Sequence, residues 1–272
     1  MRLKDFIPSP LRKLSCCSKQ SQRTYGSYAE AQAGCDSGYE ETDLVEVVYE
    51  KTRVYRDRLM QQKPFVAEAG DLRTLFGLSL PARGNVLHVI DFGGACGAHY
   101  FMARQAWGDR LKLQWHVVET PAMAAKATAI EDGQLKFFSD IQQARSDWDH
   151  VDLVFSSGAL QYVPHPYQSL ELLLECDAQH LFLTRLGLTI SGKEQIVLQE
   201  SNLVANGPGP ALPGMQDRVV RYPVTFSRKE VMEGMLSKRY AIDVLFEEDK
   251  AAYRAAGEAI DTFGYFATRK SH

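Results

Sequence analysis

The chain lacks the features that mark several common classes of protein. It has no run of about 18 consecutive apolar residues, which excludes a membrane-spanning helix, and its first residues, MRLKDFIPSP, lack the long apolar segment of a secretory signal. Its five cysteines are scattered, with no Cys-x-x-Cys pair and no Cys/His ligand spacing, so we expect neither a disulfide framework nor a metal site. The formal net charge of −3 argues against a nucleic-acid partner. These absences favour a cytoplasmic protein with reduced thiols.

Charge is distributed unevenly. Residues 1–24 carry six Lys/Arg and one Asp, a net +5, so the rest of the chain carries −8 to give the total of −3. Apolar side chains are interleaved with these basic ones, which leaves open a weak peripheral contact with the inner face of a membrane. Pro8 and Pro10 interrupt any long helix in this segment, and this favours a frayed basic tail over a membrane-binding helix.

The length of 272 residues is sufficient for one large or two small domains. We divide the chain into a basic tail, a helical N-terminal extension and a larger domain, at 1–24, 25–80 and 81–272. In the extension, apolar side chains at helical spacing predict a helix that ends near Gln62, with Thr42 or Asp43 as its cap. A second, shorter helix is expected within 66–80.

The larger domain alternates strands with helices. Apolar runs predict strands at 86–90, 113–118, 135–138, 152–156 and 180–186. Helices are predicted among them at 98–107, 121–130 and 166–176. This alternation is typical of βαβ units. We therefore expect an α/β, Rossmann-like fold with a mostly parallel sheet and helices on both faces.

After Leu188 the pattern becomes less regular. The Gly/Pro-rich stretch 205–214 excludes regular structure and is either a lid over the site or a surface loop. Beyond it we expect a helix and then two antiparallel strands, at 228–237, 240–246 and 264–268. Ser227 is the candidate cap of that helix.

The most informative segment is a glycine-rich turn after the first strand of the larger domain. In the run NVLHVIDFGGACGA the strand ends in an acid, Asp91, and glycines follow at Gly93, Gly94 and Gly97. Such a turn brings the backbone close to a nucleotide-like ligand. Two of the three glycines of the pattern G-x-G-x-x-G are missing, whereas D-x-G-x-G-x-G fits with one replacement, Ala95. Alanine strains this turn only if its φ is positive.

Three acids follow successive predicted strands. Glu119 ends the second strand, where a carboxylate accepts hydrogen bonds from ribose hydroxyls of either NAD or S-adenosylmethionine. Asp91 distinguishes between these two ligands, because its charge repels the pyrophosphate of NAD and attracts the cationic amino-acid group of S-adenosylmethionine. Asp140, after the third strand, either lies near an adenine or caps the next helix. Together the three acids favour S-adenosylmethionine.

Three segments carry a resemblance to a known family, namely Asp91–Gly97, Trp115–Pro121 and Ser156–Tyr162. They resemble class I S-adenosylmethionine-dependent methyltransferases. More narrowly, they are similar to a little-characterised bacterial family often associated with cell-surface polysaccharide gene clusters. Further similar segments are Tyr25–Ala31, Gly38–Tyr39, Tyr222–Pro223 and Phe226–Ser227. The segment Thr184–Leu186 departs from the Arg-Thr-Pro pattern usual in that family. The resemblance implies methyl transfer (EC 2.1.1.-) to a sugar or glycoconjugate.

Methyl transfer is mainly a positioning task, and a hydroxyl acceptor also needs a base. We expect Ser157, after the fourth strand, to lie by the cofactor. Tyr162 is a candidate for orienting the acceptor. His99, in the first helical turn after the glycines, is a candidate base, because the helix dipole favours its neutral form there. His165 is a second candidate base. Gln161, like Tyr162, is a candidate for orienting the acceptor hydroxyl. Weaker candidates for acceptor contact are Tyr100, Arg185 and Tyr222, whereas Cys96 is expected only to fill space.

Two other functions are compatible with these patterns. One is an NAD-dependent oxidoreductase, although no Tyr-x-x-x-Lys pair is present. The other is a non-catalytic binding module that keeps the methyltransferase fold. The function favoured by the residues is O-methylation of a polar small molecule. The acceptor atom, the base and the oligomeric state are left open.

Overall fold

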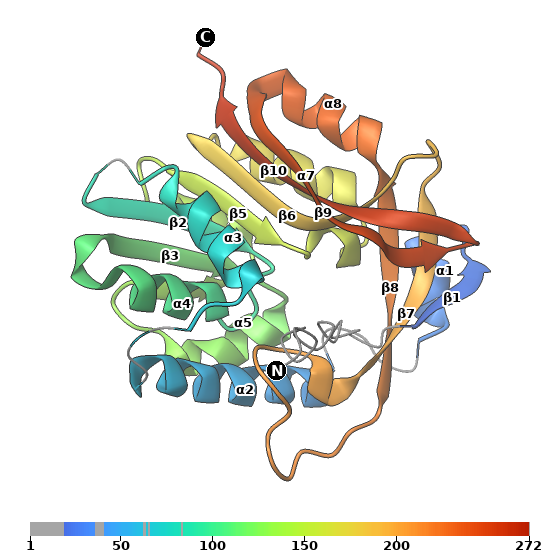
Figure 1. The fold of residues 1–272 in the computed structure, drawn as a ribbon, viewed down its shortest axis with the longest axis horizontal. Coiled ribbons are helices and arrows are strands. Elements are labelled where there is room, and N and C mark those ends of the chain that lie inside the picture. Colours follow the sequence, from blue (N-terminus) through green and yellow to red (C-terminus); the bar gives the residue numbers. More distant parts are fainter. Residues whose placement is uncertain (1–18, 36–40, 62–63, 65, 83, 272) are drawn as a thin grey trace, which may run out of the picture.

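The computed structural model describes residues 19–35, 41–61, 64, 66–82 and 84–271. Its main sheet contains five parallel strands in the order β4 (Leu135–Phe138), β3 (Lys112–Val118), β2 (Val86–Phe92), β5 (Leu153–Ser157) and β6 (His180–Thr189). Two antiparallel strands extend it, with β10 (Glu258–Arg269) beside β6 and β9 (Tyr240–Ala255) beside β10. The predicted α/β fold, the predicted parallel strands and the closing antiparallel pair are confirmed (Figure 1).

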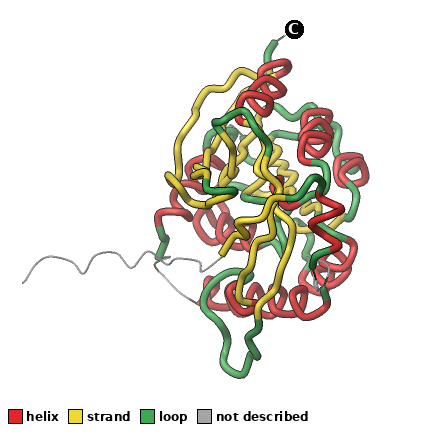
Figure 2. Tube along the Cα trace, turned by 90° about the vertical axis from the view of Figure 1, so that its right-hand side faces the viewer, coloured by secondary structure: helices red, strands yellow, loops and turns green. Residues whose placement is uncertain are grey.

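Helices cover both faces of this sheet (Figure 2). The first face packs against α2 (Thr42–Gln61), α3 (Ala69–Ser79), α4 (Ala98–Trp107) and α5 (Pro121–Ala127). The second packs against α6 (Ile141–Ser146), α7 (Pro166–Glu175) and α8 (Lys229–Arg239). The winding changes face between β2 and β5, which are neighbours in the sheet. This is the topological switch point, where open α/β sheets bind ligands outside the carboxyl ends of their strands.

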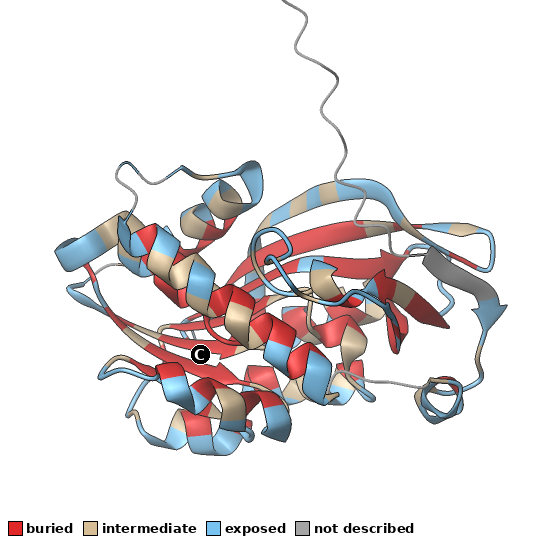
Figure 3. Cartoon of the chain, turned by 90° about the horizontal axis from the view of Figure 1, so that it is seen from below, coloured by how far each residue is buried: buried red, intermediate tan, exposed pale blue. Residues whose placement is uncertain are grey.

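The helix α2 belongs to the same core as the glycine-turn helix α4. Its buried residues Leu44, Val48 and Leu59 lie on one face, and Figure 3 shows buried and exposed residues alternating along it. It begins at Thr42, so Thr42 and Asp43 lie in its first turn, and neither is the cap that the sequence predicted. Among the described residues, no helix combines the length and the apolar character that crossing a membrane requires.

A second group of strands was not predicted. The strands β7 (Gln195–Asn202) and β8 (Val219–Arg228) pair antiparallel, and β1 (Lys19–Thr24) pairs with β7. The end of β8 also pairs parallel with the end of β6, which joins these strands to the main sheet. The short helix α1 (Tyr28–Ala33) lies against them. Sequence periodicity missed β7 because its buried positions include polar residues, Gln199 and Ser201, and missed β8 because Pro223 interrupts it. Residues 19–24 of the predicted tail are therefore a strand, and residues 1–18 lie outside the described part of the chain.

Smaller differences concern the ends of elements. Ser227 lies inside β8 and does not cap α8, whose cap position is Arg228. The helix predicted at 121–130 ends at Ala127 and continues as a short 3₁₀ turn. The 3₁₀ turns of the described chain lie at Gly108–Arg110, Thr128–Ile130, Leu160–Tyr162 and Leu203–Ala205. The stretch 205–214 has no regular structure, as predicted, except that Ala205 ends the last of these 3₁₀ turns.

Candidate functional site

The glycine turn joins β2 to α4 at the carboxyl ends of the parallel strands, which we call the carboxyl edge of the sheet, and their amino ends form the amino edge. Gly93 and Gly97 adopt positive φ angles of 72° and 78°, which favour glycine. A Cβ atom on Gly93 would lie 2.1 Å from the Cβ of Ala159, and one on Gly94 would lie 2.4 Å from Oδ2 of Asp91. The turn therefore needs glycine for conformation at two positions and for close approach at Gly93 and Gly94.

Ala95 occupies the position where the sequence pattern replaces a glycine. Its φ is 49°, so the condition for strain stated above is met. A left-handed conformation costs a non-glycine residue roughly 1–2 kcal/mol. The backbone N–H of Ala95 donates to Oε1 of Glu119 at 3.0 Å, and this bond helps to hold the strained conformation.

Asp91 is fully buried beneath this turn. Its Oδ2 accepts a hydrogen bond from the indole N–H of Trp115 at 3.1 Å. Its Oδ1 has no hydrogen-bond partner within the described residues, and the same is true of Nδ1 of His99, which lies 3.6 Å from Oδ2. A buried carboxylate oxygen without a partner is costly. The turn is therefore suited to a ligand that brings a cation or a hydrogen-bond donor.

Glu119 follows β3 and reaches back to the same turn. Its two oxygens accept hydrogen bonds from the backbone N–H groups of Ala95 and Thr120, at 3.0 and 2.9 Å. Burial raises the pKa of Glu119, the negative charge of Asp91 adds to this effect, and the two N–H groups oppose it. An ionised carboxylate can accept about four hydrogen bonds. Glu119 therefore keeps capacity for about two more donors, as a ribose diol requires.

Asp140 caps a helix. Its Oδ1 accepts a hydrogen bond from the backbone N–H of Gln143 at 2.9 Å, at the start of α6, and its side chain is exposed. Of the two roles that the sequence left open, the structure shows the cap. Its location near an adenine stays a prediction.

The ends of three neighbouring strands are joined beside the turn. The hydroxyl of Ser156 donates to the carbonyl of Phe92 at 2.9 Å, linking β5 to β2. The N–H of Gly158 donates to the carbonyl of Thr184 at 2.9 Å, linking the end of β5 to β6. Ser157, the predicted cofactor contact, lies between these two bonds as the last residue of β5.

Tyr162 belongs to a polar network that sequence analysis missed. Its hydroxyl donates to Oε1 of Gln199 at 3.2 Å. The amide of Gln199 lies 3.4 Å from the hydroxyl of Tyr222, which donates to Ser201 at 2.9 Å. The backbone carbonyl of Tyr162 accepts a hydrogen bond from Tyr28. Tyr162 is thus held in position by β7, β8 and α1, an arrangement with no local signal in the sequence.

The remaining candidates lie apart from the turn or serve as packing. His165 is exposed at the start of α7, and within the described chain no hydrogen bond joins it to another predicted site residue. The prediction that Tyr100 contacts the acceptor is wrong, because its hydroxyl forms hydrogen bonds with Asp132 and Arg104 near the amino end of β4. Cys96 is fully buried, and burial raises the pKa of its thiol to about 12, which fits the predicted packing role.

A further cluster at the carboxyl edge contains Glu248 of β9, whose side chain is 1% exposed. It accepts a hydrogen bond from the hydroxyl of Thr184 and another from the backbone N–H of Arg185, at 2.7 Å for the latter. Arg73 of α3 forms an ion pair with it at 3.3 Å. Sequence analysis missed Glu248, because only the register of the β9–β10 hairpin brings it to β6.

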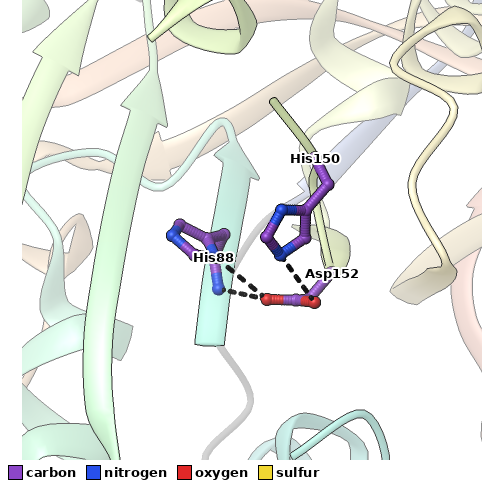
Figure 4. A group of neighbouring side chains, drawn as sticks. All are labelled: His88, His150 and Asp152. Carbon is purple, nitrogen blue, oxygen red and sulfur yellow. Dashed lines mark hydrogen bonds and ion pairs between the residues drawn. The ribbon is translucent and has the colours of Figure 1, made fainter. Parts of the chain in front are cut away.

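One group of side chains has the composition of a metal site. His88, His150 and Asp152 lie together near the amino ends of β2 and β5 (Figure 4). Oδ2 of Asp152 accepts from the backbone N–H of His88 at 2.7 Å and lies 3.2 Å from its Nδ1, while Nε2 of His150 lies 3.6 Å from Oδ1. Hydrogen bonds account for the contacts between His88 and Asp152. The group is at the sheet edge opposite to the glycine turn, and we assign it no metal role.

The amino edge also contains a groove of about 810 Å³, lined by the ends of α2 and α4 and the start of β3. Basic and acidic side chains alternate around it, among them Arg56, Asp57, Arg104 and Asp132. Neither the glycine turn nor Glu119 lines this groove.

No family model and no curated protein matches the chain in sequence. A structure with a similar fold is an S-adenosylmethionine-dependent methyltransferase from Clostridium acetobutylicum ATCC 824, at 10% identity and a TM-score of 0.47, covering 82% of this chain and 99% of that one. Another is the Burkholderia thailandensis 1,6-didemethyltoxoflavin-N1-methyltransferase, at 14% identity and a TM-score of 0.46, covering 93% and 94%. A third is the N-terminal domain of EvdMO1, solved in the presence of SAH and D-fucose, at 11% identity and a TM-score of 0.46, covering 80% and 97%. At these values the similarity is one of fold alone.

Proposed function

We propose that the protein is an S-adenosylmethionine-dependent methyltransferase (EC 2.1.1.-) that methylates a hydroxyl of a polar small molecule, sugar or glycoconjugate. The observation that carries this proposal is the buried Asp91 carboxylate under the glycine turn, whose Oδ1 has no partner among the described residues. The site lies at the switch point of the sheet, where nucleotide-like ligands bind.

The residues of the turn fit this cofactor. Asp91 supplies a negative charge for its cationic amino-acid group, and Glu119 has remaining acceptor capacity for its ribose hydroxyls. Gly93, Gly94 and Gly97 allow the backbone to approach it closely, and Ser157 stands at the end of the adjacent strand. A pyrophosphate at the same place meets two carboxylates, which disfavours a nicotinamide dinucleotide.

The chemistry follows from the residues around that turn. When bound, S-adenosylmethionine supplies an electrophilic methyl group for in-line displacement. Nδ1 of His99 faces Oδ2 of Asp91 at 3.6 Å, and its ring is packed against Phe155. We place the proton on Nδ1, which faces this carboxylate, so that Nε2 is the nitrogen that can accept a proton. We therefore assign to His99 the removal of the acceptor hydroxyl proton and to Tyr162 an orienting role, since Gln199 already holds its hydroxyl.

The proposal is tested by calorimetric titration of the protein with S-adenosylmethionine, S-adenosylhomocysteine and NADH. We expect the first two to bind and NADH not to bind. Asp91→Asn keeps the shape and an acceptor for Trp115 but removes the charge. It should weaken S-adenosylmethionine binding at least tenfold, or about 1.4 kcal/mol, without lowering the unfolding temperature. Asp147→Asn is the control, because Asp147 is an exposed acid paired with Lys136.

The outcomes separate the alternatives. Binding of NADH alone supports the oxidoreductase, and binding of none of the three ligands supports a module without this cofactor. Binding without transfer of labelled methyl to any hydroxyl of a sugar or glycan panel contradicts the proposed acceptor class. The proposed membrane contact of the basic tail falls mostly on residues 1–18, outside the described chain, and is a separate proposal.

A further inference from the structure

The strand β6 contains a bulge at the carboxyl edge of the sheet. Phe263 of β10 pairs with Leu186 and Tyr265 pairs with Leu183, so Thr184 and Arg185 together oppose the single residue Gly264. Arg185 adopts a φ of 57°. Bulges of this kind prefer glycine at the left-handed position, and they redirect side chains next to functional sites. Arginine is therefore an unusual residue at this left-handed position.

The surroundings hold Arg185 in this conformation. The buried carboxylate of Glu248 accepts both the hydroxyl of Thr184 and the N–H of Arg185, and Arg73 pairs with its other oxygen. Gly264 leaves space for the ring of Phe246 and for this carboxylate, since a Cβ there would lie 2.2 Å from Cζ of Phe246 and 2.8 Å from Oε1 of Glu248. The backbone of Arg185 is thus fixed by a buried acid on another strand, while its guanidinium takes no part in this arrangement.

The side chain of Arg185 extends toward the cofactor edge. A Cβ on Gly158 would lie 3.6 Å from both Nε and Cζ of Arg185, so the guanidinium lies against the loop that follows Ser157. Its side chain is exposed, and it forms no ion pair with any described residue. The backbone of Arg185 is strained and held by hydrogen bonds, and its guanidinium has no carboxylate partner. The guanidinium is therefore available to an anionic ligand.

We propose that Arg185 is the anion-recognition residue for the methyl acceptor, and that the acceptor carries a carboxylate or phosphate group beside its hydroxyl. This rests on the proposed function, because it places the acceptor over β5 and β6, beside the cofactor turn. A planar guanidinium binds such oxyanions through two parallel hydrogen bonds. The substrate class is therefore an acidic or phosphorylated sugar.

The test compares wild type with Arg185→Gly and Arg185→Lys, each loaded with S-adenosylhomocysteine. The probes are D-glucuronate, inorganic phosphate and neutral D-glucose. Calorimetry measures their binding, and thermal unfolding measures the stability of each variant. We expect wild type to bind glucuronate or phosphate at least tenfold more tightly than glucose. Arg185→Gly should abolish this preference, and Arg185→Lys should keep part of it. Because glycine relieves the strained φ, Arg185→Gly should unfold at the same temperature as wild type or about 1–3 °C higher. Ala251→Gly, at a φ of 49° in the β9–β10 hairpin, is the control for relief of strain alone.

Three results would overturn the proposal. The first is equal binding of anionic and neutral probes, or no binding of the anionic ones, by wild type. The second is an anion preference that survives in Arg185→Gly. The third is a loss of S-adenosylhomocysteine affinity in Arg185→Gly, which would assign the guanidinium to the cofactor. Failure of wild type to bind S-adenosylhomocysteine at all overturns instead the proposed function.

Discussion

The amino and carboxyl edges of the parallel sheet both contain aspartate and histidine, but they differ in whether hydrogen bonds within the protein satisfy these side chains. At the amino edge, Asp152 is satisfied by the backbone and ring of His88. At the carboxyl edge, Asp91 is fully buried with one oxygen unpaired within the described chain, and the nearby His99 leaves Nδ1 unpaired as well. Positive φ angles do not distinguish the two edges, because Ala95 and Arg185 adopt them at the carboxyl edge and Asp177, just before β6, adopts one at the amino edge.

This difference separates structural roles from functional ones. Aspartate–histidine pairs occur at both edges, so residue type alone does not identify the site. A buried polar group without a partner lowers stability and persists where it serves binding or catalysis. The four predictions below test this distinction, in order of decreasing effect.

At the carboxyl edge, Glu119→Ala should weaken S-adenosylmethionine binding by about 1–3 kcal/mol. The variant lacks the carboxylate that we propose to bind the ribose hydroxyls, and it loses the bond that fixes Ala95. Calorimetry measures the loss, and circular dichroism verifies that the variant is folded. An unchanged affinity in a folded variant refutes the role assigned to Glu119.

At the amino edge, Asp152→Ala should lower the free energy of unfolding by about 1–2 kcal/mol, because the N–H of His88 loses its acceptor. Affinity for S-adenosylhomocysteine should stay within about twofold of wild type. Asp149→Ala, the exposed neighbour, is the control. A large loss of affinity in Asp152→Ala would mean that the two edges are not functionally distinct.

The raised pKa of Glu119 predicts a pH dependence with a defined sign. The folded state holds this proton more tightly than the unfolded state, whose pKa is near 4.5. Stability is therefore lost as pH rises from about 4.5 through the folded pKa. Relative to Glu119→Gln, wild type should lose stability across this window, as measured by urea unfolding at a series of pH values. The opposite slope would mean that Glu119 is stabilised in its ionised form.

The smallest effect is expected from relieving strain in the glycine turn. Ala95→Gly should raise the free energy of unfolding by about 0.5–1 kcal/mol, the relief of the positive φ less the entropy cost of glycine. Cofactor affinity should be unchanged, because the turn keeps its shape. Ala251→Gly should give a similar gain. A destabilised Ala95→Gly would show that the alanine methyl packs in a way that the φ angle does not reveal.

The parallel sheet was predictable because its strands are apolar runs that repeat between helices. The neighbourhood of Asp91 and Glu119 followed from this, since the carboxyl ends of adjacent parallel strands meet at one edge. The strands β7 and β8 were not predictable, because polar residues such as Gln199 are buried there by pairing with one another across strands.

Single side-chain directions were harder to predict than strand ends. Tyr100 follows His99 in sequence, yet one residue of helix rotation directs it to Asp132 at the other end of the sheet. The partnership of Arg185 with Glu248 spans 63 positions and depends on a bulge opposite Gly264. Neither depends on a local pattern, so only the folded chain reveals them.

The most direct test of the account is a crystal structure of the protein with S-adenosylhomocysteine. We predict that the ligand lies at the carboxyl edge, with its amino group within about 3.2 Å of Asp91 and its ribose hydroxyls on Glu119. A ligand found in the groove at the amino edge, lined by Arg104 and Asp132, would contradict the account.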